Sequence, residues 1–119
     1  MQNILMIVQA AAYGNERMLG ALRLSTALVA QESTTVELRV FLMSDAVTVA
    51  LPGQAAAEAG GGLQAMLEDL LRKGVSVCLC RTCAATRGIS EARLIPGVRI
   101  STLPELAEWT LQADKVLTF

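Results

Sequence analysis

The chain has 119 residues, of which 53 % are hydrophobic and 18 % are charged, and its formal net charge is −1. This length fits one domain over residues 1–119. The charge balance, without a Lys/Arg cluster or interleaved aromatic side chains, argues against nucleic acid as a partner. No apolar run approaches the roughly 18 residues that a membrane-spanning helix needs. A small chain so poor in charge and rich in apolar residues is expected to bury more surface in an oligomer.

Five apolar runs are predicted to be strands. Several are continuous rather than alternating, which is typical of strands buried on both faces. The first run has no basic residues before it, so a strand is favoured over a signal peptide, and the chain is expected in the cytoplasm. The predicted strands are Ile4–Gln9, Val36–Met43, Val75–Cys80, Lys115–Phe119 and the weaker Val98–Ser101.

Helical spacing of apolar residues predicts helices between these strands. Asn15 is the expected N-cap of the first helix, and Gly74 is the expected residue just past the second. Thr102 and Glu105 have the spacing of a capping box at the start of the last. The predicted helices are Glu16–Gln31, Gly62–Lys73, the short Thr82–Thr86, and Leu103–Ala113.

Alternation of strands and helices predicts an α/β fold. We expect three layers, with a mainly parallel sheet of about five strands and helices on both faces. In such sheets, sites form outside the carboxyl ends of the strands. Here those ends lead into the loops 10–15, 44–46 and 81–88. The apolar run at 46–51 is expected in either the core or an interface. The Gly/Ala-rich stretch at 55–62 is expected to be a flexible loop rather than a phosphate-binding loop.

All three cysteines lie in the stretch VSVCLCRTCAATRGI, Val75–Ile89. They are too close together, and odd in number, for a disulfide framework, and they fit a reducing compartment. Cys78 falls inside the strand, where a cysteine is usually a small buried hydrophobe. Cys80 falls where the strand ends, and Cys83 follows it in C-x-x-C spacing.

Chemistry at Cys80 would require a thiolate. A helix N-terminus and nearby cations lower a thiol pKa, and Arg81 and Arg87 flank the pair. Cys83 would then be a resolving thiol or a second station for transferred sulfur. The alternative is that both cysteines are strand-end and helix residues without a chemical role.

Other chemistries find little support in the sequence. Zinc typically takes four Cys or His ligands, and the chain has three cysteines and no histidine, so no metal or cofactor is expected. The lack of histidine also excludes a Cys–His dyad and a Ser–His–Asp triad. Tyr13 with Gly14, after the first strand, and Asp45, after the second, are candidates to line a cleft with the cysteines, although each alone is more typical of a turn or cap.

Four segments in order resemble the DsrE/DsrF-like family of small sulfur-relay proteins. They are YGNERMLGALRLSTALV (Tyr13–Val29), VFLMSDAVTVAL (Val40–Leu51), VCLCRTCAATRGI (Val77–Ile89) and LPELAEWTLQADKVLTF (Leu103–Phe119). The resemblance implies an α/β fold and trimeric or hexameric assembly. It also implies that a strand-end cysteine eight residues before a glycine accepts persulfide sulfur. Cys80 precedes Gly88 by that interval, and Cys83 matches a second cysteine found in one branch of the family.

The favoured hypothesis is a sulfur-relay protein. The Cys80 thiolate attacks the terminal sulfur of a donor persulfide, and the sulfur then passes to an acceptor protein. The expected partners are sulfur-donor and sulfur-acceptor proteins, in a homotrimer or homohexamer, without nucleic acid or membrane. Two alternatives stay open: a dithiol redox protein using the C-x-x-C pair, and an oligomeric module that binds a small ligand or a protein without catalysis. The residues expected to bind are Tyr13, Gly14, Asp45, Arg81, Arg87 and Gly88.

Overall fold

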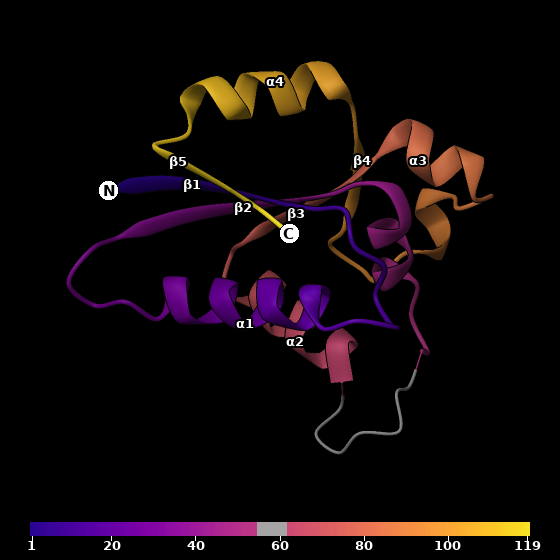
Figure 1. Ribbon diagram of the computed structural model, residues 1–119, viewed down its shortest axis with the longest axis horizontal. Coiled ribbons are helices and arrows are strands. Elements are labelled where there is room, and N and C mark those ends of the chain that lie inside the picture. The colour runs from indigo at the N-terminus through magenta and orange to yellow at the C-terminus, as the bar shows by residue number, and fades with distance from the viewer. Residues whose placement is uncertain (55–61) are drawn as a thin grey trace.

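The computed structural model describes residues 1–54 and 62–119, and residues 55–61 of the loop predicted at 55–62 lie outside the described residues. Strands and helices alternate along the chain, as the sequence predicts (Figure 1). The strands are β1 (Gln2–Val8), β2 (Val36–Leu42), β3 (Ser76–Cys80), β4 (Arg99–Ser101) and β5 (Lys115–Thr118). The helices are α1 (Arg17–Val29), α2 (Gly62–Arg72), α3 (Arg81–Thr86) and α4 (Leu103–Gln112), with two short 3₁₀ turns, η1 (Ser44–Ala50) and η2 (Glu91–Arg93).

The strands form one sheet in the order β4-β3-β2-β1-β5. Every pairing between neighbouring strands is parallel. The carboxyl ends of all five strands therefore lie along one edge of the sheet, and β3 lies next to β2 there. This arrangement confirms the predicted α/β class and brings the loops after β2 and β3 side by side.

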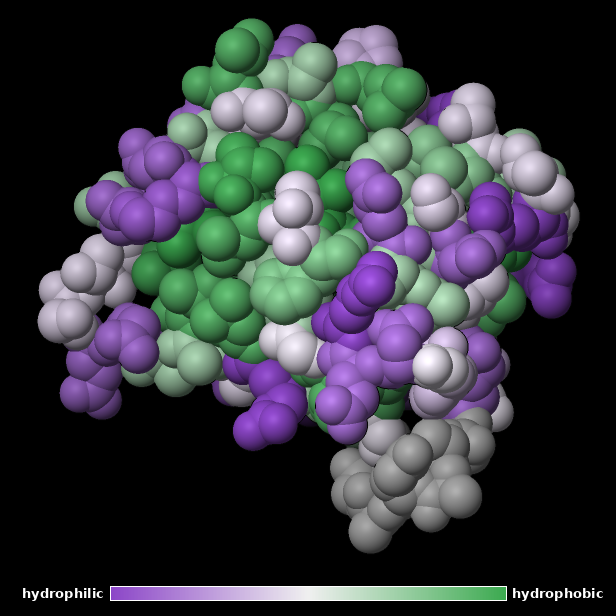
Figure 2. All heavy atoms as spheres, viewed as in Figure 1, coloured by the Kyte–Doolittle hydropathy of each residue, from purple (hydrophilic) through white to green (hydrophobic). Residues whose placement is uncertain are grey.

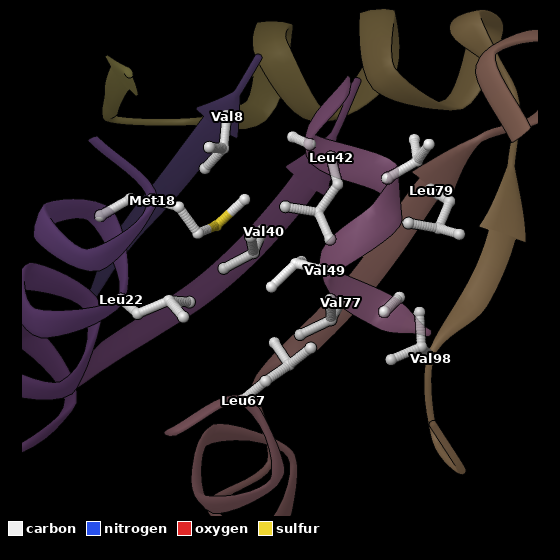
Figure 3. Packing of buried hydrophobic residues seen from close by; sticks show 14 of the residues in the cluster. Val8, Met18, Leu22, Val40, Leu42, Val49, Leu67, Val77, Leu79 and Val98 are labelled. Carbon is white, nitrogen blue, oxygen red and sulfur yellow. The ribbon is translucent and has the colours of Figure 1, made fainter. Parts of the chain in front are cut away.

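Helices cover both faces of the sheet, which makes the three layers (Figure 1). α1 and α2 lie on one face, where Met18, Leu22 and Leu67 pack against strand residues such as Val40 and Val77 (Figure 3). α4 lies on the other face. Its apolar cluster is smaller and consists of Leu5, Phe41, Cys78, Cys80, Leu106 and Trp109.

The alternation of side chains along β3 decides which layer each cysteine enters. Val77 and Leu79 point to the α1/α2 face, while Cys78 and Cys80 point to the α4 face. Phe41 of β2 is the register partner of Cys78, and Trp109 of α4 meets the Phe41 ring edge-on at a centroid distance of 6.1 Å. The strand cysteines therefore lie beneath α4.

The predicted helix ends are largely confirmed. The exception is the start of α1: its N-cap is Glu16 rather than the predicted Asn15, and it begins at Arg17 rather than Glu16. The Asn15 side chain instead accepts a hydrogen bond from the backbone N–H of Arg17 at 2.9 Å, just before the helix. Gly74 has φ of +86° and follows α2, as a left-handed residue past a helix does. Thr102 caps α4 by accepting a hydrogen bond from the N–H of Glu105.

The capping box at α4 is only half formed. The Glu105 carboxylate accepts a hydrogen bond from the Ser101 hydroxyl at 2.8 Å, which turns it toward β4. The boundary of α1 also differs from the prediction: the helix ends at Val29 rather than Gln31.

The segment after β2 is the main element that the sequence patterns do not identify. Ser44–Ala50 forms the 3₁₀ turn η1 rather than a loop limited to residues 44–46. Its Ala46, Val47, Val49 and Ala50 are buried, which assigns the 46–51 run to the core of the chain. Among the residues that the structure describes, no helix is both long enough and apolar enough to cross a membrane.

Candidate functional site

The candidate site lies where β3 ends and α3 begins. Cys80 is the last residue of β3 and the N-cap of α3, with extended backbone angles (φ −62°, ψ 125°). Cys83 is the third residue of the helix. Because the chain turns from strand to helix at Cys80, the first N–H groups of α3 have no partners within the helix and face its sulfur.

These surroundings favour the thiolate at Cys80. Burial raises the pKa of Cys80, but hydrogen bonds from the side chains and backbone N–H groups of Thr82 and Cys83 outweigh burial and bring the pKa below its ordinary value. The Thr82 hydroxyl oxygen lies 3.3 Å from Cys80 Sγ. The local donors of α3, rather than the flanking arginines, are therefore the main features that favour the anion.

Cys83 has the opposite tendency. Burial, followed by the neighbouring Cys80 sulfur, raises the pKa of Cys83. The backbone N–H of Ser44 and the charge of Arg87 oppose that rise. Of the two thiols, Cys80 therefore has the lower pKa and ionises more readily than Cys83.

Ser44 reaches Cys83 through an unusual backbone conformation. Among the described residues other than glycine, Ser44 alone has positive φ, at 52°. It follows Met43 at the end of β2, where the chain turns into η1, and its N–H opposes the rise in the pKa of Cys83 that burial causes. Left-handed backbone outside glycine is uncommon and tends to occur at functional sites.

An ion pair joins η1 to the end of α3. Arg87 donates to Asp45 Oδ1 from Nε at 3.2 Å and from Nη2 at 2.9 Å. Its Nη1 donates to the backbone carbonyl of Cys83 at 3.1 Å. Arg87 therefore links Asp45 to the backbone of Cys83, and the hydrogen bonds of its guanidinium go to the carboxylate and that carbonyl.

Cys78 has the surroundings of a structural residue. Its side chain is fully buried beneath α4, and burial raises its pKa. Arg99 Nη2 lies 3.5 Å from its sulfur and 3.9 Å from Glu105 Oε1. The prediction that Cys78 is a small buried hydrophobe is confirmed.

The remaining predicted residues lie around this centre. Arg81 is exposed at the start of α3. Tyr13 is exposed, and Gly14 has φ of +98°, in the loop after β1, two strands away from β3. Within the described residues, the hydrogen bonds of the cysteine pair do not include Tyr13, so a cleft shared by Tyr13 and the cysteines stays a prediction.

Sequence reasoning missed two donors, Thr82 and Ser44. Thr82 lies between the two cysteines in the sequence. A hydroxyl two residues after a strand-end cysteine could have been predicted to lie near its sulfur. Ser44 left no comparable signal, because its importance comes from a positive φ and from the pairing of β2 with β3. Within residues 1–54 and 62–119, no cluster of three or more Cys, Asp and Glu side chains is arranged to hold a metal ion.

Comparison with known proteins identifies the family. The profile of the DsrE/DsrF-like family matches residues 2–119. The chain belongs to that family. Its members generally take part in sulfur relay.

Two known proteins are similar to this chain over its full length. The protein YchN of Escherichia coli strain K12 is 55 % identical over 119 residues, which cover 100 % of both chains. The crystal structure of YchN from E. coli superposes with a TM-score of 0.92 at 54 % identity and full coverage of both chains. A protein of unknown function from Methanobacterium thermoautotrophicum, MTH1491, shares the fold, with a TM-score of 0.81 at 16 % identity over the whole of each chain.

The DsrE/DsrF-like spacing of cysteine and glycine has a geometric reason in this chain. Gly88 adopts φ of +68° just past α3. Its N–H bonds to the Ala85 carbonyl at 3.1 Å, and the N–H of Ile89 bonds to the Ala84 carbonyl at 2.9 Å. Gly88 thus follows the end of the short helix that begins after Cys80. The interval of eight residues from Cys80 to Gly88 therefore spans α3 (Arg81–Thr86) and its C-cap Arg87.

Proposed function

We propose that this chain is a sulfur carrier that holds persulfide sulfur on Cys80. The observation that carries the proposal is the position of Cys80 at the N-cap of α3, where local donors lower its pKa despite burial. Family membership supports sulfur relay in general. The reducing cytoplasm is the compartment we propose, because clustered free thiols persist there.

The chemistry is exchange at sulfur. The Cys80 thiolate attacks the outer sulfur of a persulfide, R–S–SH, forming Cys80–S–SH and releasing R–S⁻. An acceptor thiolate later takes the outer sulfur in the same way, which regenerates the Cys80 thiolate. No group other than the reacting sulfurs gains or loses electrons, and no histidine is needed.

The test is the mass of the intact protein after incubation with a small-molecule persulfide. We expect a gain of one sulfur atom, removable by dithiothreitol and located on Cys80 by peptide mapping. A protein that gains no sulfur from several persulfide donors would refute the proposal.

We also propose that the chain works as a homotrimer or homohexamer with separate sulfur-donor and sulfur-acceptor proteins. β5 lies at the edge of the sheet, and Figure 2 shows apolar side chains gathered over β5 and the adjoining part of α1. Val116 and Leu24 are 40 % and 36 % exposed there. An open strand edge beside an exposed apolar patch is typical of a surface that pairs with another chain.

Light scattering tests the assembly. The wild type is expected at three or six times the mass of the chain, and Val116→Glu is expected to shift it toward the monomer. The exposed Leu111→Glu on α4 controls for an added charge at an apolar position. A monomeric wild type would contradict the proposed assembly but not the chemistry at Cys80.

A second candidate function is dithiol redox exchange between Cys80 and Cys83. The C-x-x-C spacing favours it, because Cys80 is the N-cap of α3 and Cys83 lies in the first turn of the same helix. It differs from sulfur transfer in its product, which is a Cys80–Cys83 disulfide that lacks added sulfur. Oxidation with glutathione disulfide, followed by mass mapping, separates the two functions.

A further inference from the structure

The two thiols of the pair differ in access to solvent. Cys80 is only 2 % exposed, and it belongs to the apolar cluster beneath α4. Cys83 is partly exposed and packs against the clusters on both faces of the sheet, so it lies at the rim of the sheet. The sulfur that ionises more readily is therefore the less accessible of the two. This matters because a persulfide donor must reach the sulfur atom that attacks it.

We infer that sulfur reaches Cys80 through Cys83, which forms the first persulfide at the rim and passes its outer sulfur inward. This inference rests on the proposed function and adds a second reacting residue to it. The persulfide that Cys80 attacks is then the one on Cys83 rather than the one on the donor. The donor needs to approach only the exposed side of α3.

Cys83 is held in place for this step from two directions. The N–H of Ser44, a residue with left-handed backbone after β2, opposes the rise in the pKa of Cys83 that burial causes. The Cys83 carbonyl accepts a hydrogen bond from Arg87, and Arg87 is bound to Asp45 of η1. The Ser44 N–H can stabilise a negative charge on Cys83 at the moment it attacks, since a hydrogen bond to the charged form favours that form.

The sequence of steps is balanced. The Cys83 thiol first transfers its proton to the Cys80 thiolate across their hydrogen bond. The Cys83 thiolate attacks the outer sulfur of R–S–SH, giving Cys83–S–SH and R–S⁻, and R–S⁻ takes the proton from Cys80 and leaves as R–SH. The Cys80 thiolate then attacks the outer sulfur of Cys83–S–SH, giving Cys80–S–SH and the Cys83 thiolate.

Alkylation of the wild-type protein tests access without relying on sulfur transfer. Iodoacetamide is added in small excess near neutral pH, and peptide mapping follows each cysteine with time. We expect Cys83 to react first and Cys80 to react at least about tenfold more slowly, because direct access to Cys80 requires local opening of α3. Faster modification of Cys80 than of Cys83 would overturn the inference.

Sulfur loading of Cys83→Ser tests the route itself. Loading of Cys80 by a small-molecule persulfide is expected to fall at least about tenfold, because the donor must then wait for α3 to open. Cys78→Ala, which removes a thiol that plays no part in the steps, is expected to load at the wild-type rate. Loading of Cys80 in Cys83→Ser at the wild-type rate would overturn the route while leaving Cys80 as the carrier. A wild type that takes up no sulfur would instead contradict the proposed function, and the alkylation order would still decide whether Cys83 controls access.

Discussion

Cys78 and Cys80 lie two residues apart on β3, point to the same face of the sheet and are both buried. Their pKa values nevertheless shift in opposite directions. Burial dominates at Cys78 and raises its pKa, whereas at Cys80 the hydrogen bonds of α3 outweigh burial. The difference comes from position along the strand, since the backbone N–H groups beside Cys78 are used within the sheet and those beyond Cys80 belong to an open helix end.

This contrast shows how one strand supplies both a packing residue and a reactive one. Inside the sheet, a thiol next to Phe41 contributes apolar contact. At the carboxyl end of the same strand, and on the same face, the Cys80 thiol lies beside the first N–H groups of α3, which have no partners within the helix. The four predictions that follow test each half of the contrast.

Phe41→Ala should produce the largest loss of stability. The ring is fully buried beside Cys78 and beneath Trp109, and removal of a buried phenylalanine ring costs about 3–5 kcal/mol. Chemical denaturation measures the free energy of unfolding. The control Leu111→Ala on the exposed side of α4 should change it by no more than about 0.5 kcal/mol. Equal losses in the two variants would show that the region beneath α4 is not a packed core.

The alkaline pH dependence of stability should report on Cys78. The folded protein keeps the Cys78 proton while the unfolded thiol ionises near its ordinary pKa, so the stabilising effect of the raised pKa is present at neutral pH and is lost as pH rises. Above about pH 8.5 this one group lowers the free energy of unfolding by about 1.4 kcal/mol per pH unit until its folded pKa is reached. Cys78→Ala should remove that part of the slope. A slope unchanged in this variant would contradict the assigned role of burial.

Thr82→Val should weaken the thiolate at Cys80 without removing a sulfur. The variant keeps the shape of the side chain and loses the hydroxyl that lies 3.3 Å from Cys80 Sγ. We expect the pKa of Cys80 to rise and the rate of sulfur loading at neutral pH to fall at least about tenfold, since one hydrogen bond to a charged group contributes about 1.5–3 kcal/mol. The loss should shrink as pH is raised, because more of the thiol then ionises. Thr86→Val, at the far end of α3, is the matched control, and an equal loss there would point to the stability of α3 instead.

Asp45→Asn should have the smallest effect on stability. The pair with Arg87 joins η1 to α3, but the Asp45 carboxylate is 68 % exposed, and such pairs contribute at most about 1 kcal/mol. We expect a change of that size in denaturation, reduced further in high salt. A loss of several kcal/mol would mean that the pair holds the two segments together more strongly than its exposure implies.

Much of this arrangement was predictable from the sequence. Continuous apolar runs separated by helical patterns are enough to predict a parallel sheet, and Gly74 and Thr102 mark helix ends through local chemistry. The C-x-x-C pair falls at a strand end because the apolar run stops at Cys80. These signals are local, so they do not depend on how the strands are ordered.

The details of the site depend on contacts between distant segments, and local sequence patterns do not show which segments are neighbours. The meeting of Ser44 with Cys83 requires β2 to lie beside β3 and the chain to take a left-handed turn after β2. The pairing of Arg87 with Asp45 joins residues 42 positions apart. The half-formed capping box has the same origin, since Glu105 finds a competing donor in Ser101 of β4.

The most direct test of the account is sulfur loading of Cys80→Ser beside Cys78→Ala, read as intact mass after incubation with the same persulfide. The account predicts that Cys78→Ala gains one sulfur atom as the wild type does. It predicts that Cys80→Ser retains none, because the Cys83 thiol then lacks the Cys80 thiolate that takes its proton. Stable loading of Cys80→Ser, or its loss in a folded Cys78→Ala, would contradict the claim that the strand-end thiol is the carrier.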